Sequence, residues 1–187
     1  MQREASSDEE TRIIQRAITG EKQAFGLLYE KYAKAIFKYV FIRLGNHEDA
    51  EDMTETVFIK AWESLSSFNR FSRGMNFRAW LYRIAHNSLV DLFRKKNESL
   101  PLDGISQIPA NAIHPLKELE LRESAERISG AIRQLDEKSA QVILNRFVAG
   151  MDHREIGQVM GLREGNIRII QFRALIKLRE LLGDRDE

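Results

Sequence analysis

Apolar residues return every three or four positions over most of this chain, which is the period of an α-helix. Between residues 23 and 96 three such stretches follow one another, and between 117 and 184 the same spacing resumes. The alternation of apolar and polar residues that marks a strand is absent from the first of these regions. The pattern predicts an all-α protein.

Breaks in the helical spacing divide the chain into parts. Gly45-Asn46 and the polar segment 66–74 separate three expected helices, the last of which begins near Asn76. Between 98 and 116 the spacing is lost, and all three prolines lie there. We therefore expect two small helical domains, at 20–97 and 117–187, joined by an irregular linker over 98–116 and preceded by an N-terminal extension, 1–19, whose first dozen residues are frayed.

The second domain carries the spacing of a helix-turn-helix. Asp152 and Glu155 form a helix-start pattern, Gly161 permits a tight turn, and a second helix is expected from about residue 164. That helix would bury Ile167, Ile170, Ala174 and Leu178 and turn outward Arg168, Ile169, Phe172, Arg173 and Ile176. Guanidinium groups can bind phosphates or guanine, and apolar side chains can contact thymine methyls. The same shape also arises from packing alone, and the apolar residues could instead dock a protein.

The third expected helix of the first domain has a polar face that suits nucleic acid. Its members fall three or four residues apart: Arg83, Asn87, Asp91 and Arg94, followed by Lys95 and preceded by Arg78. Nearby aromatic residues, Phe68, Phe71, Phe77, Trp80 and Tyr82, could stack an unpaired base, although Phe77 and Trp80 at helical spacing are typical of a core.

The preceding helix opens with an acidic face formed by Asp49, Asp52 and Glu55. Such a face can dock a partner, hold a metal ion or simply favour the helix dipole. The net charge is only +1, but residues 70–96 and 163–179 are both strongly basic. Two basic stretches predict two contacts with a polyanion, unless both are solvated helix faces.

Several classes of function are excluded or disfavoured by composition. The chain has no cysteine, which removes thiol catalysis and cysteine-ligated metal sites. It has no Gly-rich phosphate loop, no Gly-x-Ser-x-Gly and no His-Glu-x-x-His. We expect no enzyme activity, no cofactor and no metal site. No apolar run is long enough for a membrane span and the start lacks a signal-peptide core, so a cytoplasmic protein is expected.

Three ordered motifs resemble the extracytoplasmic-function (ECF) class of bacterial RNA polymerase sigma factors. They are Asp49-Ala50-Glu51-Asp52 with 57–62, then Phe77-Arg78-Ala79-Trp80-Leu81-Tyr82-Arg83-Ile84-Ala85-His86-Asn87, and finally Glu155-Ile156-Gly157 with 164–168 and Arg173-Ala174. The likeness covers about 20–97 and 126–183.

This resemblance implies a subunit that binds core RNA polymerase and directs it to promoter DNA. It implies that the first domain opens the proximal promoter element and that the acidic face docks on the clamp helices of the largest polymerase subunit. Loop 68–76 would hold a flipped base, and Arg78, Arg83, Asn87 and Asp91 would meet the separating strand. The distal element would be contacted by Arg146, Arg168, Ile169, Phe172 and Arg173. An anti-sigma factor is a further implied partner, and the linker would run towards the polymerase cleft.

Two departures from the family pattern change these expectations. Glu55-Thr56 stands where the family usually has Gln-Glu, and Ile169-Ile170 replaces a polar pair, which favours methyl contacts over hydrogen bonds. An autonomous helix-turn-helix regulator, which would dimerise on paired half-sites, is the main alternative. A structural adaptor and a metal-dependent nuclease are the other two classes considered.

Overall fold

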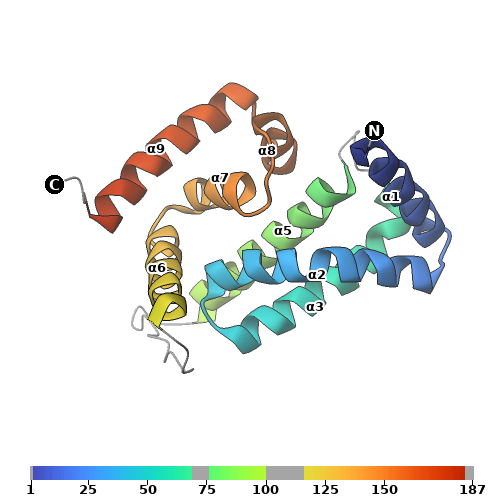
Figure 1. The fold of residues 1–187 in the computed structure, drawn as a ribbon, viewed down its shortest axis with the longest axis horizontal. Helices are drawn as coiled ribbons and strands as arrows, with labels where there is room; N and C mark the ends of the chain where they lie inside the picture. Colours follow the sequence, from blue (N-terminus) through green and yellow to red (C-terminus); the bar gives the residue numbers. More distant parts are fainter. Residues whose placement is uncertain (1, 69–75, 100–115, 184–187) are drawn as a thin grey trace.

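The computed structural model describes residues 2–68, 76–99 and 116–183 of the 187. Within these ranges the regular structure is entirely helical, with eight α-helices, one short 3-10 turn and no strand. Figure 1 shows two groups of helices lying against each other. The all-α prediction is confirmed.

The first domain is built around three long helices that contact one another. They are α2 (Lys22–Leu44), α3 (His47–Ser64) and α5 (Phe77–Ser99), with the turn η1 (Leu65–Ser67) after α3. Gly45 ends α2 in a left-handed conformation, and Asn46 caps α3 by accepting the Asp49 backbone N–H. Apolar residues that recur at helical spacing along α2 and α3 are buried: Leu28, Tyr32, Ile36, Tyr39, Ala50, Val57 and Ala61.

The N-terminal segment corrects the sequence prediction. It forms helix α1 (Gln2–Ile18), which packs on α2 and η1 instead of fraying. Ile14 and Ala17 are buried in the common core, and Glu10 accepts a hydrogen bond from Tyr32 and pairs with Lys31. Packing of Ile14 and Ala17 on the core, together with the polar contacts of Glu10, stabilises this helix through tertiary contacts.

The second domain contains the predicted helix-turn-helix. It comprises α6 (Leu116–Arg133), α7 (Glu137–Phe147), α8 (His153–Met160) and α9 (Glu164–Leu182). Asp152 and Glu155 make a complete capping box at the start of α8, and Gly161 ends that helix with φ 68°. Of the four residues of α9 predicted to face inward, Ile167, Ala174 and Leu178 are buried and Ile170 is half-buried.

The two domains pack on each other through α2 against α6 and α5 against α8. Polar contacts cross this boundary at several points: Arg43 pairs with Glu137, Arg78 with Glu155, and Arg133 Nη1 donates to the Ile42 carbonyl at 3.2 Å. The sequence analysis did not predict this association. Most of the expected linker, 100–115, lies outside the described residues; α5 continues to Ser99 and α6 begins at Leu116.

His86 lies at the domain boundary beside Glu137 and Arg43. Burial, and secondarily the Arg43 guanidinium, lowers the pKa of His86 to about 4. An unfolded histidine has a pKa of about 6.5. The stability contributed by neutral His86 is therefore fully present above pH 6.5 and is lost as the pH falls towards 4.

When the pH falls from 7 to 4.5, the wild type should lose roughly 2 kcal/mol of unfolding free energy through His86. His86→Gln should not show this part of the loss. Urea unfolding at the two pH values measures this. His47→Gln is the control, because the His47 side chain is 70% exposed, although it lies near Glu51 and the Phe37 ring. An equal acid-induced loss in wild type and His86→Gln would contradict this account of His86.

Gly157 marks the closest approach in the helix-turn-helix. A Cβ added there would lie 2.7 Å from the Leu162 carbonyl oxygen, the backbone of the turn that leads into α9. The turn is further held by a hydrogen bond from the Leu162 N–H to the Gly157 carbonyl at 3.0 Å. The glycine is therefore required for space and not for a left-handed backbone.

Gly157→Ala is expected to destabilise the protein by about 1–3 kcal/mol, because the turn has to shift to relieve the clash. Gly165→Ala, in the first turn of α9, is the control: an added Cβ meets nothing within 4 Å. Thermal unfolding should show a fall for the first variant and no fall for the second. A tolerated Gly157→Ala would show that the turn is less tightly built than this.

Candidate nucleic-acid interface

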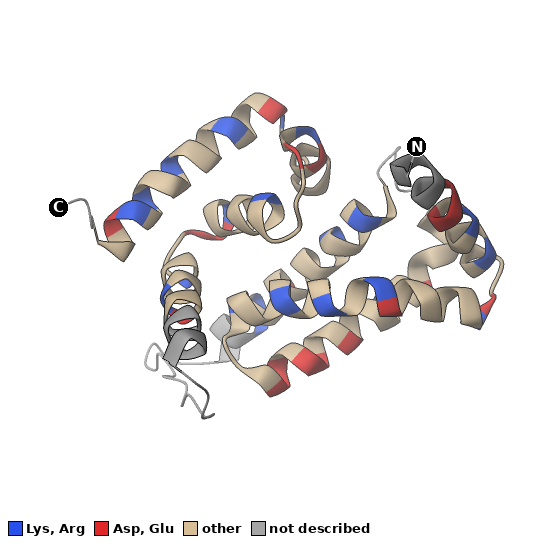
Figure 2. Cartoon of the chain, viewed as in Figure 1, with Lys and Arg blue, Asp and Glu red and all other residues tan. Residues whose placement is uncertain are grey.

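The outer face of α9 carries the predicted mixture of cationic and apolar side chains. Ile169 and Phe172 are 53% and 67% exposed, unusually high for large apolar residues, and Arg168 and Arg173 are exposed beside them. Basic residues recur along this helix in Figure 2. A helix that follows a tight turn and presents such a face has the form of a recognition helix that enters a major groove.

Intramolecular contacts distinguish the arginines of the second domain. Arg168 donates to Glu164 at 2.6 Å within α9, whereas Arg173 has no ion-pair partner among the described residues. Arg146 is half-buried and donates to the Met151 carbonyl at 2.9 Å, which ties α7 to the turn before α8. Arg146 thus has a structural role in this arrangement, and its expected contact with DNA stays a prediction.

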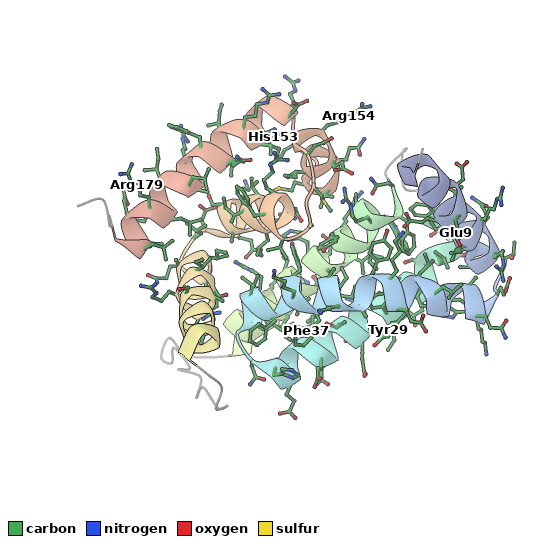
Figure 3. The ribbon with its side chains drawn as sticks, viewed as in Figure 1. Glu9, Tyr29, Phe37, His153, Arg154 and Arg179 are labelled. Carbon is green, nitrogen blue, oxygen red and sulfur yellow. The ribbon has the colours of Figure 1, made fainter. Side chains whose placement is uncertain are left out.

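Helix α8 adds polar groups that the sequence analysis did not select. His153 Nε2 lies 2.9 Å from Gln171 Oε1, which links the start of α8 to α9, and Arg154 is exposed. Figure 3 shows His153 and Arg154 together at the α8 end of this domain. These two residues could have been suggested by their place in the first turn of the helix before the recognition helix.

The polar face predicted on α5 is present. Arg83, Asn87 and Arg94 are exposed, Asp91 is half-buried, and Arg94 pairs with Asp91 at 3.3 Å. Lys95 is also exposed, and it is the last residue of α5 whose side chain is described. Arg83 has no ion-pair partner within the described ranges, so its guanidinium is available to a phosphate or a base.

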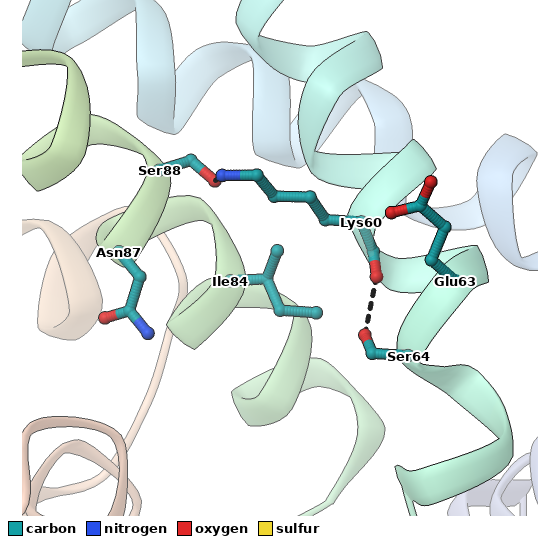
Figure 4. A pocket seen from close by; sticks show the side chains of 6 residues that line it. All are labelled: Lys60, Glu63, Ser64, Ile84, Asn87 and Ser88. Carbon is teal, nitrogen blue, oxygen red and sulfur yellow. Dashed lines mark hydrogen bonds between the residues drawn. The ribbon is translucent and has the colours of Figure 1, made fainter.

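Asn87 also borders an open hollow of about 400 Å³ between α3 and α5. It is lined by Lys60, Glu63, Ser64, Ile84, Asn87 and Ser88 (Figure 4). Lys60 reaches across it and donates to Ser88 Oγ at 3.0 Å. A hollow with an ammonium group, an amide and an apolar wall has the chemistry to hold a planar, hydrogen-bonding group. Apart from Asn87, its residues were missed, because they come from two helices and share no sequence pattern.

The aromatic residues near this face are structural. Phe68, Phe77 and Trp80 are buried and form a cluster whose ring centroids lie 5.1–5.8 Å apart. Tyr82 is buried against Tyr39, and burial raises the pKa of Tyr82 to about 12. The suggestion that these rings stack an unpaired base is therefore wrong for this arrangement, and the core interpretation holds. Phe71 and the rest of the expected base-binding loop, 69–75, lie outside the described residues.

Arg78 differs from the other predicted DNA contacts. Its Nη2 lies 2.8 and 3.0 Å from the two carboxylate oxygens of Glu155, on α8 of the other domain. Arg78 was predicted to contact DNA together with Arg83 and Asn87, but here its guanidinium is already occupied by a carboxylate.

The predicted acidic face is exposed on α3. Asp49, Asp52 and Glu55 are all solvent-accessible, together with Glu48 and Glu51. Acidic residues gather towards the start of α3 in Figure 2. Among the described residues, no group of three or more His, Cys, Asp or Glu side chains is arranged to hold a metal ion.

Two regions of this chain match models of one protein family. Residues 28–99 match sigma-70 region 2, and residues 131–180 match sigma-70 region 4. The chain belongs to the sigma factor family. The region 2 match places the acidic face and the α5 face in one family unit, which favours a sigma factor over an autonomous helix-turn-helix regulator.

The chain is similar to sigma factors of the ECF class. It is 32% identical over 174 residues to the ECF RNA polymerase sigma factor BldN of Streptomyces coelicolor, a match that covers 92% of this chain and 65% of that protein. It is 29% identical over 181 residues to the ECF RNA polymerase sigma factor SigW of Bacillus subtilis, covering 91% and 95% of the two chains.

A solved structure supports the arrangement of the whole chain. The structure of CnrH in complex with the cytosolic domain of CnrY is 27% identical, with a TM-score of 0.69, and the match covers 94% of this sigma factor and 97% of that chain. The two-domain helical fold is thus shared along nearly the full length. None of the helices in the described part of this chain has both the length and the apolar character needed to cross a membrane.

The exposure of Phe172 separates a role in binding from a role in folding. We expect Phe172→Ala to leave the melting temperature unchanged but to lower transcription from a cognate promoter about tenfold, because one well-placed base contact contributes about 1–3 kcal/mol. Leu182→Ala, which removes another exposed apolar side chain of α9, should change neither. Full transcription with Phe172→Ala would remove this residue from the DNA-contacting surface.

Proposed function

We propose that this sigma factor binds core RNA polymerase through α3 and reads a promoter with α5 and α9. The observation that supports the proposal is the presence of three exposed surfaces of different chemistry, acidic, polar-basic and mixed cationic-apolar, on the two family regions in the family's order. The chain supplies recognition and not catalysis, and it acts in the cytoplasm, where the polymerase is.

The acidic face of α3 is the proposed contact with the clamp helices of the largest polymerase subunit. Asp49, Asp52 and Glu55 are exposed on one side of a well-capped helix and need no rearrangement to meet a basic partner. Opposite charges on two surfaces speed their encounter and disfavour wrong partners.

The α5 face is the proposed contact with the proximal promoter element. Arg83 and Arg94 are placed to neutralise phosphates, while Asn87 lies beside the hollow between α3 and α5. Unstacking a base costs a few kcal/mol, and a preformed hollow lowers that cost. The α3–α5 hollow is therefore proposed to receive an unpaired base, with Lys60 and Asn87 as hydrogen-bonding groups.

The α9 face is the proposed contact with the distal element. Arg168 and Arg173 would bind phosphates or guanine, and Ile169 and Phe172 would contact thymine methyls. Because each domain contributes few contacts, tight binding requires both elements to be engaged together on the polymerase.

A protein inhibitor of the anti-sigma kind is a proposed third partner. Support comes from CnrH, whose structure was solved with the cytosolic domain of CnrY. The large exposed apolar residues of α9 offer a surface that such a protein could cover.

Charge reversal on α3 tests the polymerase contact. Asp49→Arg with Asp52→Arg should reduce co-purification with bacterial core RNA polymerase at least tenfold, because two attractive contacts become repulsive. Asp8→Arg with Glu9→Arg makes the same change in charge at two exposed positions of α1 and should leave the complex intact.

Run-off transcription from genomic fragments completes the test. Wild-type protein with core polymerase should give new start sites, and the α3 double variant should give none at the same concentration. A wild-type protein that folds, binds DNA and never joins the polymerase would contradict the proposed function.

A further inference from the structure

The bond between Arg78 and Glu155 joins a predicted DNA contact to the helix-turn-helix. Arg78 Nη2 lies 2.8 Å from Oε1 and 3.0 Å from Oε2, and Asn76 Nδ2 donates to the same Oε1 at 2.6 Å. The Glu155 side chain is 20% exposed. A carboxylate that binds a guanidinium through both oxygens offers the interaction that a DNA phosphate would offer.

Glu155 is fixed in this position by its own helix. Its Oε2 accepts the Asp152 backbone N–H at 3.0 Å, while the Glu155 N–H donates to Asp152 Oδ1 at 2.8 Å. The carboxylate is therefore already oriented before it meets Arg78. Pairing with Arg78 requires only that α8 lie against the start of α5.

A second charged cluster holds the opposite end of the domain boundary. Arg43 is 8% exposed, pairs with Glu137 at the start of α7, and lies 5.2 Å from the centre of the Phe93 ring. Arg133 adds a hydrogen bond to the Ile42 carbonyl at 3.2 Å. Within the described ranges, most of the polar side-chain contacts between the domains thus involve a charged group and are sensitive to single substitutions.

The face of α7 towards the first domain carries polar side chains that do not make all of their hydrogen bonds. Residues 139–145 are buried on every side, with α8 and α9 covering one part of the helix. Helical spacing places Gln141 and Asn145 on the side that carries Glu137, which contacts the first domain. Gln141 Nε2 and both polar atoms of the Asn145 side chain are buried and find no hydrogen-bond partner among the described residues.

Unpaired buried amides oppose burial and would gain hydrogen bonds to water if the domains separated. An interface built to be permanent would place apolar residues there. The domain boundary thus has charged contacts at its two ends and amides without hydrogen bonds between them. Such an association is held by electrostatic attraction and can open.

We propose that the packing of the two domains is an autoinhibitory latch in which Glu155 occupies Arg78 in place of a DNA phosphate. The inference rests on the proposed function, because it gives Arg78 a role in DNA binding. In the closed form Arg78 is withheld; in the open form Arg78 is free and the α7 amides are hydrated. Only the open fraction of the free chain can bind DNA through Arg78. The apparent dissociation constant for DNA is therefore the intrinsic constant divided by that open fraction.

Glu155→Gln tests the latch without removing the helix cap. Glutamine can still accept the Asp152 N–H, as in other capping boxes, but it lacks the charge that holds Arg78. We expect the radius of gyration, measured by small-angle X-ray scattering, to increase. We expect affinity for fluorescein-labelled single-stranded DNA of mixed sequence, measured by anisotropy, to rise about threefold to tenfold.

Two further variants control for charge and for folding. Glu180→Gln removes the same charge from a carboxylate that pairs with Lys177 inside α9, so it should affect DNA affinity little and leave the radius of gyration unchanged. Arg78→Gln opens the latch from the other side and leaves α8 untouched. It should expand the chain without the gain in affinity, because the DNA contact is lost with the latch.

The outcomes separate the latch from the proposed function. Expansion in both latch variants, with tighter DNA binding only in Glu155→Gln, supports the proposal. A radius of gyration equal to that of the wild type in both variants overturns it, even if transcription proceeds normally. With saturating core polymerase, Glu155→Gln and wild type should transcribe equally; failure of both would defeat the proposed function, while scattering without polymerase still decides the latch.

Discussion

The capping box at the start of α8 is the constraint on which much of this structure depends. Asp152 and Glu155 satisfy each other's backbone N–H groups and fix where α8 begins. Gly157, in the middle of α8, has no side chain and so leaves room for the backbone of Leu162 in the turn that leads into α9. The same Glu155 carboxylate then reaches Arg78. A local helix-start motif thereby controls both the placement of the recognition helix and the association of the domains.

The surfaces assigned to different partners do not share a helix. The acidic residues lie on α3, the α5 face holds Arg83 and Asn87, and the α9 face holds Arg173 and Phe172. Separation of these surfaces keeps the acidic dock from neutralising the basic ones, although the net charge of the chain is only +1. Arg78 is the exception, because domain packing brings it to an acidic partner, and it is at this residue that the closed arrangement and DNA binding compete.

Sequence periodicity predicted the helices of both domains and the inner face of α9, because these features are set by neighbours three or four residues away. The helix-turn-helix was predicted for the same reason: its cap, its glycine and its buried residues all lie within about one short segment. The exposed positions of Asp49, Asp52, Glu55, Arg83 and Asn87 were likewise correct.

Contacts between distant residues could not be predicted in this way. Arg78 and Glu155 are far apart in sequence, and so are Arg43 and Glu137, so no local pattern indicates either pair. The hollow beside Asn87 is formed by two helices, and the burial of Phe68 and Trp80 depends on packing that composition does not specify. α1 was mistaken for a frayed end because, from residue 8 onwards, where its side chains are described, only Ile14 and Ala17 are fully buried, too few to give a clear period.

A distance between the two domains tests most directly whether this sigma factor has a closed form that must open before it acts. Because the chain has no cysteine, Lys38→Cys on α2 and Arg154→Cys on α8 allow two spin labels to be attached at exposed positions. Pulsed electron paramagnetic resonance should give a single short distance in the free protein and a longer one when core RNA polymerase is bound. An unchanged short distance in a transcribing complex would contradict the account.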